Sequence, residues 1–298
     1  MRRCPDDRFS RLWLVSFGDS RLVKPRRRLM RQALEFGLLE DHIIIKNEED
    51  LDSSFREEMK ERLILGSRGY GYWCWKPEVC LEAFRLMQNG DVLLFLDIGC
   101  HLRTSGRMRF LDYLRTAEET GSCGFQARSL SDFAISDFSE HVYINATLTK
   151  GDVFDYFRVR DDPRFTKSGQ IEASAFFLKK SAETENFLFR WLQVFRDDFA
   201  LMDDTPSKSP NLPGFTENRH DQSALTILWL KNHFSTFSAC EIEPLAKYAK
   251  GLTGVRFDPV WGASWFWRMA QYPIQARRDK GTLSFYQKMR RFIRQRFI

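Results

Sequence analysis

The chain has 298 residues, of which 43% are hydrophobic and 14% aromatic, and it carries a formal net charge of +6. A chain this long and apolar buries a sizeable core in one large α/β domain or two small ones, which excludes general disorder. The six cysteines form no CxxC pair, so the sequence indicates neither a disulfide framework nor a zinc site and favours the reducing cytosol. Residues 1–9 are polar, and no run reaches the roughly 18 apolar residues of a membrane-spanning helix, so we expect neither a signal peptide nor a membrane span.

The first half of the chain alternates strand and helix signals. The expected elements are strands at Leu12–Phe17, His42–Ile45 and Val92–Leu96, and helices around Leu29–Phe36, at Leu51–Leu63 and at Pro77–Gln88. The last of these helices has a proline in its first turn and Gly90 just beyond its end, as helix termini favour. Repeated β-α-β units predict a mostly parallel sheet that helices cover on both faces.

The second half is less regular. The expected elements are strands at Ser122–Gln126 and Gln170–Leu178, an amphipathic helix at Ala182–Phe199 and a short helix at His220–Trp229. Residues 205–214 hold three prolines and predict a loop, and 203–214 is the internal stretch where we expect disorder. We therefore expect one α/β domain at 8–250 and a helical extension at 251–298.

The C-terminal extension interleaves basic and apolar side chains. Phe285, Met289 and Phe292 follow helical spacing, and the basic residues from Arg277 to Arg296 mostly occupy the other positions. Such a basic amphipathic helix is typical of binding to an anionic membrane surface. The alternative is a terminal helix that docks its apolar side on the domain, and the sequence leaves both open.

Two polar segments follow buried strands of the expected sheet, at residues 18–20 (GDS) and 97–101 (DIGCH). Ligands of an open parallel sheet bind outside the carboxyl ends of its strands. The carboxylate of Asp97 requires solvent, hydrogen bonds or a metal there, and a hard divalent cation would hold a diphosphate group. Gly99 would let the backbone approach such a ligand. The alternative is that Asp97 only caps the next turn.

Three further segments combine polar, glycine and aromatic residues beside expected elements. Residues 68–77 (RGYGYWCWKP) offer two cations for phosphate oxygens, aromatic rings for stacking and a helix start that favours anions; the alternative is a structural loop that anchors the helix. Residues 219–223 (RHDQS) open a helix as a cap or as a compact polar site. Glu172, at the start of the apolar strand expected at Gln170–Leu178, is either a structural hydrogen-bond acceptor or a group that orients an acceptor sugar.

In this order, SFGDS, RGYGYWCWKP, GDVLLFLDIGC, GQIEAS and RHDQS resemble the motifs of bacterial glycosyltransferases of the GT-A type that act in surface-polysaccharide assembly. The resemblance covers about two-thirds of the chain, from Ser16 to Ser223, and implies a GT-A fold. It implies that Asp97 matches the first Asp of a DxD motif, which binds Mn²⁺ or Mg²⁺ and the donor diphosphate. Gly99 replaces the second Asp, so the number of protein ligands to the metal is open.

The resemblance also implies a donor site and its chemistry. The implied donor-binding residues are Phe17, Gly18, Asp19, Ser20, Arg68, Tyr72, Trp75, Lys76, Asp97, Gly99, His220 and Gln222. The segment 17–20 would touch the nucleoside, Arg68 and Lys76 the diphosphate, and Asp221 with Gln222 the transferred sugar. Asp221 and Glu172 are the candidates for the base that deprotonates an acceptor hydroxyl.

The expected activity is transfer of a hexosyl group, with galactose as one candidate, from a UDP-sugar to a glycan or lipid-linked glycan. The expected location is the cytoplasm, at the inner face of the cytoplasmic membrane. A non-catalytic sugar- or nucleotide-binding protein on a degenerate fold is the alternative. A nucleic-acid-binding protein fits less well, because the basic residues gather at the C-terminus and no RNA-binding or zinc-finger pattern is present.

Overall fold

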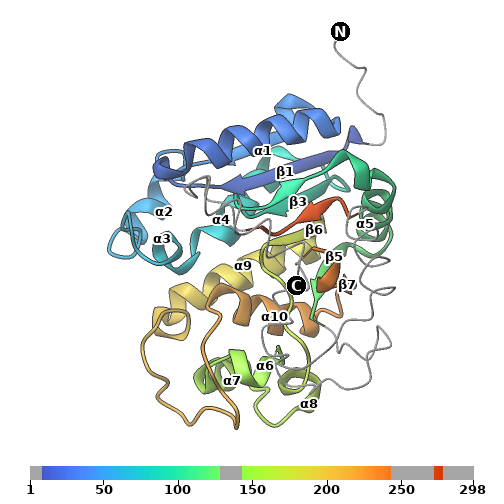
Figure 1. The fold of residues 1–298 in the computed structure, drawn as a ribbon. Helices are drawn as coiled ribbons and strands as arrows, with labels where there is room; N and C mark the ends of the chain where they lie inside the picture. Colours follow the sequence, from blue (N-terminus) through green and yellow to red (C-terminus); the bar gives the residue numbers. More distant parts are fainter. Residues whose placement is uncertain (1–8, 128–142, 243–271, 278–298) are drawn as a thin grey trace, which may run out of the picture.

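The computed structural model describes residues 9–127, 143–242 and 272–277 (Figure 1). Within them, a central sheet has the strand order β2-β1-β3-β6-β5-β7. Its strands are β1 (Leu12–Phe17), β2 (Ile43–Lys46), β3 (Val92–Leu96), β5 (Ser122–Gln126), β6 (Ala175–Lys179) and β7 (Thr236–Ser238). β1 pairs in parallel with β2 and β3, and β5 with β7, whereas β6 runs antiparallel to both of its neighbours. The predicted mostly parallel sheet is therefore confirmed.

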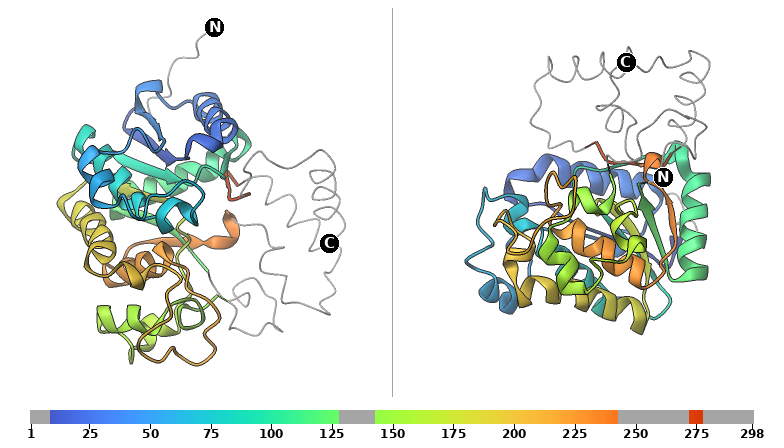
Figure 2. Two further views of the ribbon diagram at one scale, coloured as in Figure 1. Left: turned by 90° about the vertical axis from the view of Figure 1, so that its left-hand side faces the viewer. Right: turned by 90° about the horizontal axis from the view of Figure 1, so that it is seen from below.

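The described helices cover both faces of this sheet. They are α1 (Val23–Phe36), α2 (Ser53–Glu58), α3 (Gly69–Tyr72), α4 (Trp75–Leu86), α5 (Arg107–Thr120), α6 (Asn145–Leu148), α7 (Gly151–Phe157), α8 (Pro163–Thr166), α9 (Ala182–Asp197) and α10 (Asp221–Lys231). A single-turn helix, η6 (Phe199–Leu201), follows α9. Figure 2 shows α9 (yellow) and α10 (orange) side by side, and the two helices are in contact.

The period-two alternation of side chains divides the core into two layers. Leu93 and Phe95 of β3 face one layer, which α4, α9 and α10 complete. Val92, Leu94 and Leu96 face the other layer, together with α1 and α5. All five side chains are essentially fully buried, so β3 is a central strand covered on both sides. The α/β class expected from the sequence is confirmed by this layering.

Several expected boundaries were wrong, and local contacts explain the differences. The helix expected at 51–63 ends at Glu58, and the chain then forms turns in which Arg62 and Leu63 bond back to the carbonyl of Met59. The strand expected from Gln170 begins only at Ala175, because Ile171 makes one isolated bridge to Gln126 before the chain reaches β6. The segment 203–214 is described throughout as a loop without helix or strand.

Most of the predicted C-terminal extension lies outside the described residues, and so does the amphipathic helix that was predicted to bind a membrane surface. The described part, 272–277, contains β8 (Ile274–Gln275), which pairs antiparallel with β4 (His101–Leu102) at the end of the 97–101 segment. None of the described helices is long and apolar enough to cross a membrane. The five cysteines in the described ranges are buried and form no disulfide bond with one another, as expected of small core residues.

Candidate functional site

A cavity of about 590 Å³ opens at the carboxyl ends of β1 and β3. Most of its lining residues come from the segments 17–22, 67–76, 97–100, 172–174 and 219–222. These segments lie far apart in the sequence, and each contains one of the polar motifs singled out above. The edge of a parallel sheet where strands end is the usual place for a ligand in α/β proteins. The fold therefore brings the separate motifs to one cavity.

Nearly all the predicted site residues line this cavity. They are Phe17, Gly18, Asp19, Arg68, Trp75, Lys76, Asp97, Gly99, Glu172, His220, Asp221 and Gln222. Ser20 and Tyr72 do not line it. The backbone N–H of Ser20 donates to the carboxylate of Glu48 (2.7 Å), and the hydroxyl of Tyr72 donates to Asp204 (3.0 Å).

The cavity also includes residues that sequence reasoning missed. Tyr70, Trp73, Ser174 and Arg219 line it, and each lies inside or directly beside a quoted motif. All four would have been predicted if every residue of each motif, and not only a selection, had been expected to line the cavity. Ala276 lies beside β8, a part of the chain that the sequence offered no reason to place there.

A left-handed turn before α4 shapes one wall. Five consecutive residues have positive φ: Gly69 (60°), Tyr70 (50°), Gly71 (83°), Tyr72 (52°) and Trp73 (63°). This conformation costs a residue with a side chain roughly 1–2 kcal/mol, so surrounding contacts must stabilise the turn. The indole N–H of Trp75 donates to the carbonyl of Gly69 (2.9 Å) across it. A Cβ on Gly69 would lie 2.4 Å from the ring of Trp73, so glycine is required there.

Lys76, in the first turn of α4, is only 2% exposed, and its ammonium group lies against three acceptors. Nζ lies 2.7 Å from Oδ2 of Asp221, 3.3 Å from Oδ1 of Asp97 and 3.1 Å from the carbonyl oxygen of Ala173. An ammonium group has three N–H donors, so three acceptors match it completely. A diphosphate could contact Lys76 only by replacing one of these three acceptors. The predicted contact between Lys76 and the donor diphosphate therefore stays a prediction.

The two carboxylates around Lys76 differ in burial. The side chain of Asp97 is 34% exposed, whereas that of Asp221 is 6% exposed. Burial raises the pKa of Asp221 to about 6, although the nearby Lys76 ammonium opposes that rise. A carboxylate with its pKa close to neutrality is suited to exchanging a proton at neutral pH.

A second polar cluster lies where the turn before α4 meets the loop after η6. Arg68 Nη1 donates to Oδ1 of Asp204 (3.0 Å), and the Tyr72 hydroxyl donates to its Oδ2 (3.0 Å). Nε2 of His220 lies 3.6 Å from Oδ1 of the same carboxylate. The Nδ1–H of His220 donates to the carbonyl of Met202 (2.8 Å), and burial lowers the imidazole pKa. Three residues that were predicted to bind the sugar donor, Arg68, Tyr72 and His220, therefore surround the carboxylate of Asp204.

Gln222 is held in place by an amide beneath the cavity. Its Nε2 donates to Oε1 of Gln170 (2.8 Å), which is 1% exposed. Gln170 in turn donates to Leu148 and Thr149, at 3.1 Å each. This chain of bonds fixes the amide of Gln222, so that its remaining polar groups can address a sugar hydroxyl.

A divalent metal at Asp97, as the sequence predicts, would need further ligating side chains close to that carboxylate. Within the described ranges, no three His, Cys, Asp or Glu side chains gather closely enough to hold a metal ion. The carboxylate of Asp97 is paired with Lys76, and the carboxylate nearest to His220 Nε2 is that of Asp204. The described residues by themselves therefore do not form a metal centre of three such ligands. The predicted metal stays untested, and no step below uses one.

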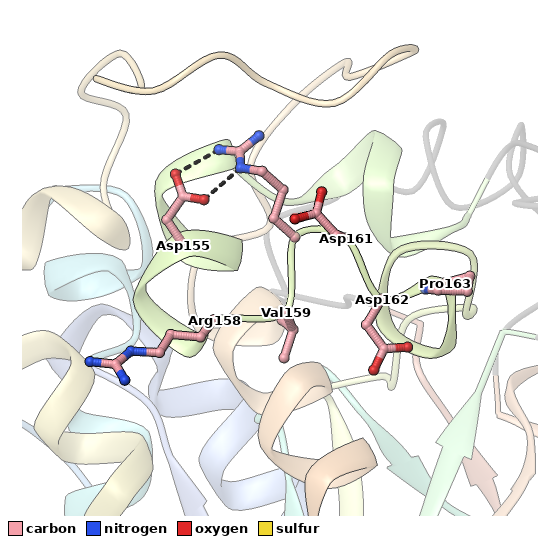
Figure 3. A pocket seen from close by; sticks show the side chains of 7 residues that line it. Asp155, Arg158, Val159, Asp161, Asp162 and Pro163 are labelled. Atoms are coloured by element: carbon pink, nitrogen blue, oxygen red, sulfur yellow. Dashed lines mark hydrogen bonds and ion pairs between the residues drawn. The ribbon is translucent and has the colours of Figure 1, made fainter.

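A second hollow lies on the surface between α7 and α8 (Figure 3). Two of its three carboxylates, those of Asp155 and Asp162, already have partners. Asp155 is bonded by Arg160, which with Ser209 lowers the pKa of Asp155 to about 2, and Asp162 is bonded by Arg164 at 2.6 Å. Carboxylates held in this way are poor candidates for catalysis, and none of the sequence motifs contributes to the hollow.

No protein-family model matches the chain, and no curated protein matches its sequence. Among solved structures, the chain is similar to mouse xyloside xylosyltransferase 1, with 13% identity and a TM-score of 0.41, over 89% of this chain and 97% of that one. It is also similar to the WbbM bifunctional glycosyltransferase (8% identity, TM-score 0.46, over 89% and 45%). A third similar structure is the galactosyltransferase LgtC (10%, 0.37, 88% and 85%). At these identities and TM-scores, function has to be argued from the cavity itself.

Proposed function

We propose that the protein is a glycosyltransferase of the GT-A type that moves a hexosyl group from a UDP-sugar to a hydroxyl of a glycan or lipid-linked glycan. The observation that carries this proposal is the convergence of five separate motifs on one cavity at the sheet edge. That cavity combines aromatic rings for a base or sugar, cations for phosphates and buried carboxylates for hydroxyls, which is the chemistry that a nucleotide-sugar requires.

In the reaction, an acceptor hydroxyl oxygen bonds to the anomeric carbon of the donor sugar while the bond from that carbon to the UDP oxygen breaks. The electron pair of that bond leaves with UDP. In an inverting transfer, Asp221 or Glu172 takes the acceptor proton; in a retaining transfer, the departing phosphate takes it and the carboxylates position the sugar. Arg68 stabilises the negative charge that grows on UDP. The side chain of Gln222, which its hydrogen bond to Gln170 holds in place, contacts a hydroxyl of the transferred sugar.

The biological setting belongs to the same proposal. We place the activity in surface-polysaccharide synthesis, such as that of an O-antigen, at the inner face of the cytoplasmic membrane. The basic C-terminal tail would bring the enzyme to a lipid-linked acceptor there. UDP-galactose is the first donor to test.

The test is a screen of UDP-sugars for UDP release by the purified chain, with and without glycan acceptors. Release from one sugar, stimulated by an acceptor, is the expected result. Asp221→Asn and Glu172→Gln should each lower the rate, and the residue that acts as the base should lower it by about 100-fold. Glu119→Gln, on the exposed surface of α5, is the matched control and should keep the wild-type rate. UDP binding without any release would favour the non-catalytic alternative.

A further inference from the structure

We infer that Arg68, Tyr72 and His220 form a binding subsite for phosphate groups, and that Asp204 occupies this subsite as an internal anion until a ligand displaces it. That the ligand is the diphosphate of a nucleotide-sugar rests on the proposed function. That the three side chains form an anion site is independent of the proposed function, because it is argued from their contacts alone.

The contacts describe an anion site that is already filled. Asp204 uses both of its oxygens, with Oδ1 bonded to the guanidinium of Arg68 and Oδ2 bonded to the hydroxyl of Tyr72, at 3.0 Å each. The two donors come from the turn before α4, whereas Asp204 comes from the loop after η6. A guanidinium and a phenol that point at one carboxylate bind a phosphate oxygen through the same geometry.

His220 supplies the second observation. Its Nε2 has no hydrogen-bond partner, although the residue is only 2% exposed and lines the cavity. Because Nδ1 donates to Met202, the neutral ring presents a lone pair at Nε2, and this nitrogen donates to an anion only after it takes up a proton. Nε2 faces Asp204 from 3.6 Å. A buried nitrogen without a partner is costly. A phosphate group carries more negative charge than a carboxylate, which favours the protonated imidazole, and it has more oxygens, so it can bond Arg68, Tyr72 and protonated His220 at once.

The carboxylate of Asp204 is exchangeable, because it is half exposed. The side chains of Arg68 and Asp204 are 48% and 52% exposed, and ion pairs this exposed contribute only about 0–1 kcal/mol. The neighbouring Asp203 anchors the loop separately, since its carboxylate accepts the backbone N–H of Thr205 (2.8 Å) and lies 3.7 Å from Lys150. The Asp204 side chain can therefore leave while the root of the loop stays in place.

Arg68 and His220 line the cavity, although Asp204 and Tyr72 do not, so Asp204 should compete with any anion that reaches Arg68 and His220 from the cavity. A diphosphate carries more negative charge than one carboxylate and forms a bidentate pair with a guanidinium, so it displaces Asp204 at a cost in affinity. That cost is the measurable signature of the arrangement. Removing the charge of Asp204 should tighten anion binding, whereas removing the charge of Arg68 should weaken it.

The experiment titrates inorganic pyrophosphate, and separately UDP, into the full chain by calorimetry. Asp204→Asn keeps the size and the acceptor oxygen of the side chain but removes its charge, and it should bind pyrophosphate about tenfold more tightly than the wild type. Arg68→Met should bind it about tenfold more weakly, and Tyr72→Phe about threefold more weakly, because the phenol donor is lost. Glu119→Gln, which removes an exposed charge from α5, should stay within about twofold of the wild type.

Two outcomes would overturn the inference. One is an Asp204→Asn variant that binds pyrophosphate no more tightly than the control, and the other is an Arg68→Met variant that binds it as tightly as the wild type. Thermal unfolding of each variant separates a folding defect from a binding defect. The UDP-sugar screen keeps the two proposals apart: turnover that ignores Asp204 and Arg68 retains the transferase and removes the subsite. Pyrophosphate binding that follows the expected order, without any turnover, retains the subsite and removes the transferase.

Discussion

Two cations of the segment 68–77 meet the same cavity in opposite environments. Lys76 is buried and touches two carboxylates and a carbonyl, whereas Arg68 is half exposed and touches one carboxylate on a loop. Burial removes the competition of water, so the network around Lys76 is fixed and holds the site together. Exposure leaves the pair of Arg68 weak and open to exchange. We infer that a cation in this cavity is available to a ligand only where its own partners are easily displaced, as that of Arg68 is.

The largest expected effect comes from removing the buried cation. Lys76→Met leaves Asp97 and Asp221 facing each other without their common counter-charge, so we expect the free energy of unfolding to fall by about 3–5 kcal/mol. Arg68→Met, the exposed counterpart, should change it by less than about 1 kcal/mol. Denaturant unfolding of both variants measures the difference.

A double variant sharpens this result. Lys76→Met combined with Asp221→Asn removes one of the two stranded charges, so it should recover part of the lost stability. Equal losses for Lys76→Met and Arg68→Met would mean that burial does not distinguish the two cations, and the comparison would then be wrong.

The next largest effect concerns the turn that carries both cations. Gly69→Ala places a Cβ against the ring of Trp73 at positive φ, and it should lower the stability by about 1–3 kcal/mol and weaken UDP binding by displacing Arg68 and Lys76. Gly121→Ala is the control: Gly121 also has positive φ (88°), but a Cβ there meets nothing within 4 Å. The control should lose only about 1 kcal/mol and bind UDP normally. Identical behaviour of the two variants would remove the role assigned to the turn.

The sequence predicted the strands that carry this site better than it predicted the contacts between the side chains. The apolar runs at β1 and β3 predicted those strands to the residue, since a strand buried on both faces requires a continuous apolar segment. The rule that ligands bind at strand ends then placed Asp19 and Asp97 at the cavity correctly. The roles proposed for these residues remain predictions.

The contacts between distant segments could not be predicted. Arg68 and Asp204 lie 136 positions apart, and nothing in residues 203–214 indicated that this proline-containing loop delivers a carboxylate to the RGYGYWCWKP segment. Tyr72 was expected in the cavity, but the left-handed turn directs its hydroxyl to Asp204. Backbone conformations of this kind depend on tertiary contacts such as the one between Trp75 and Gly69, which propensity does not encode.

A smaller effect concerns pH, because Asp221 should make activity and stability change in opposite directions. Burial raises its pKa to about 6, with Lys76 and Asp97 as the charged groups that face it. The transfer rate should fall about tenfold per pH unit below that value, as the carboxylate takes up a proton. The unfolded carboxyl has a pKa near about 4, so the native state binds the proton more tightly between about pH 4 and 6. The contribution of Asp221 to stability therefore falls as the pH rises through this window.

Rates and denaturant unfolding across this range, for the wild type and Asp221→Asn, measure both responses. The variant should lose the low-pH stabilisation and the rate dependence together. A variant whose rate profile keeps the wild-type shape would show that another group, with Glu172 the first to examine, controls the proton.

The smallest expected effect is that of a divalent metal on UDP binding. It tests whether the buried network around Lys76 is fixed. If Lys76 is the cation that neutralises Asp97 and Asp221, then Mn²⁺ has no carboxylate pair left to bind, and UDP affinity should be the same in Mn²⁺ and in a chelator, within about twofold. Calorimetry of UDP with the wild type and Asp97→Asn is the measurement. Tighter binding in Mn²⁺ that Asp97→Asn abolishes would restore Asp97 as a metal ligand. It would also mean that Lys76 gives up a partner when the donor arrives, so that the buried cation is as exchangeable as the exposed one.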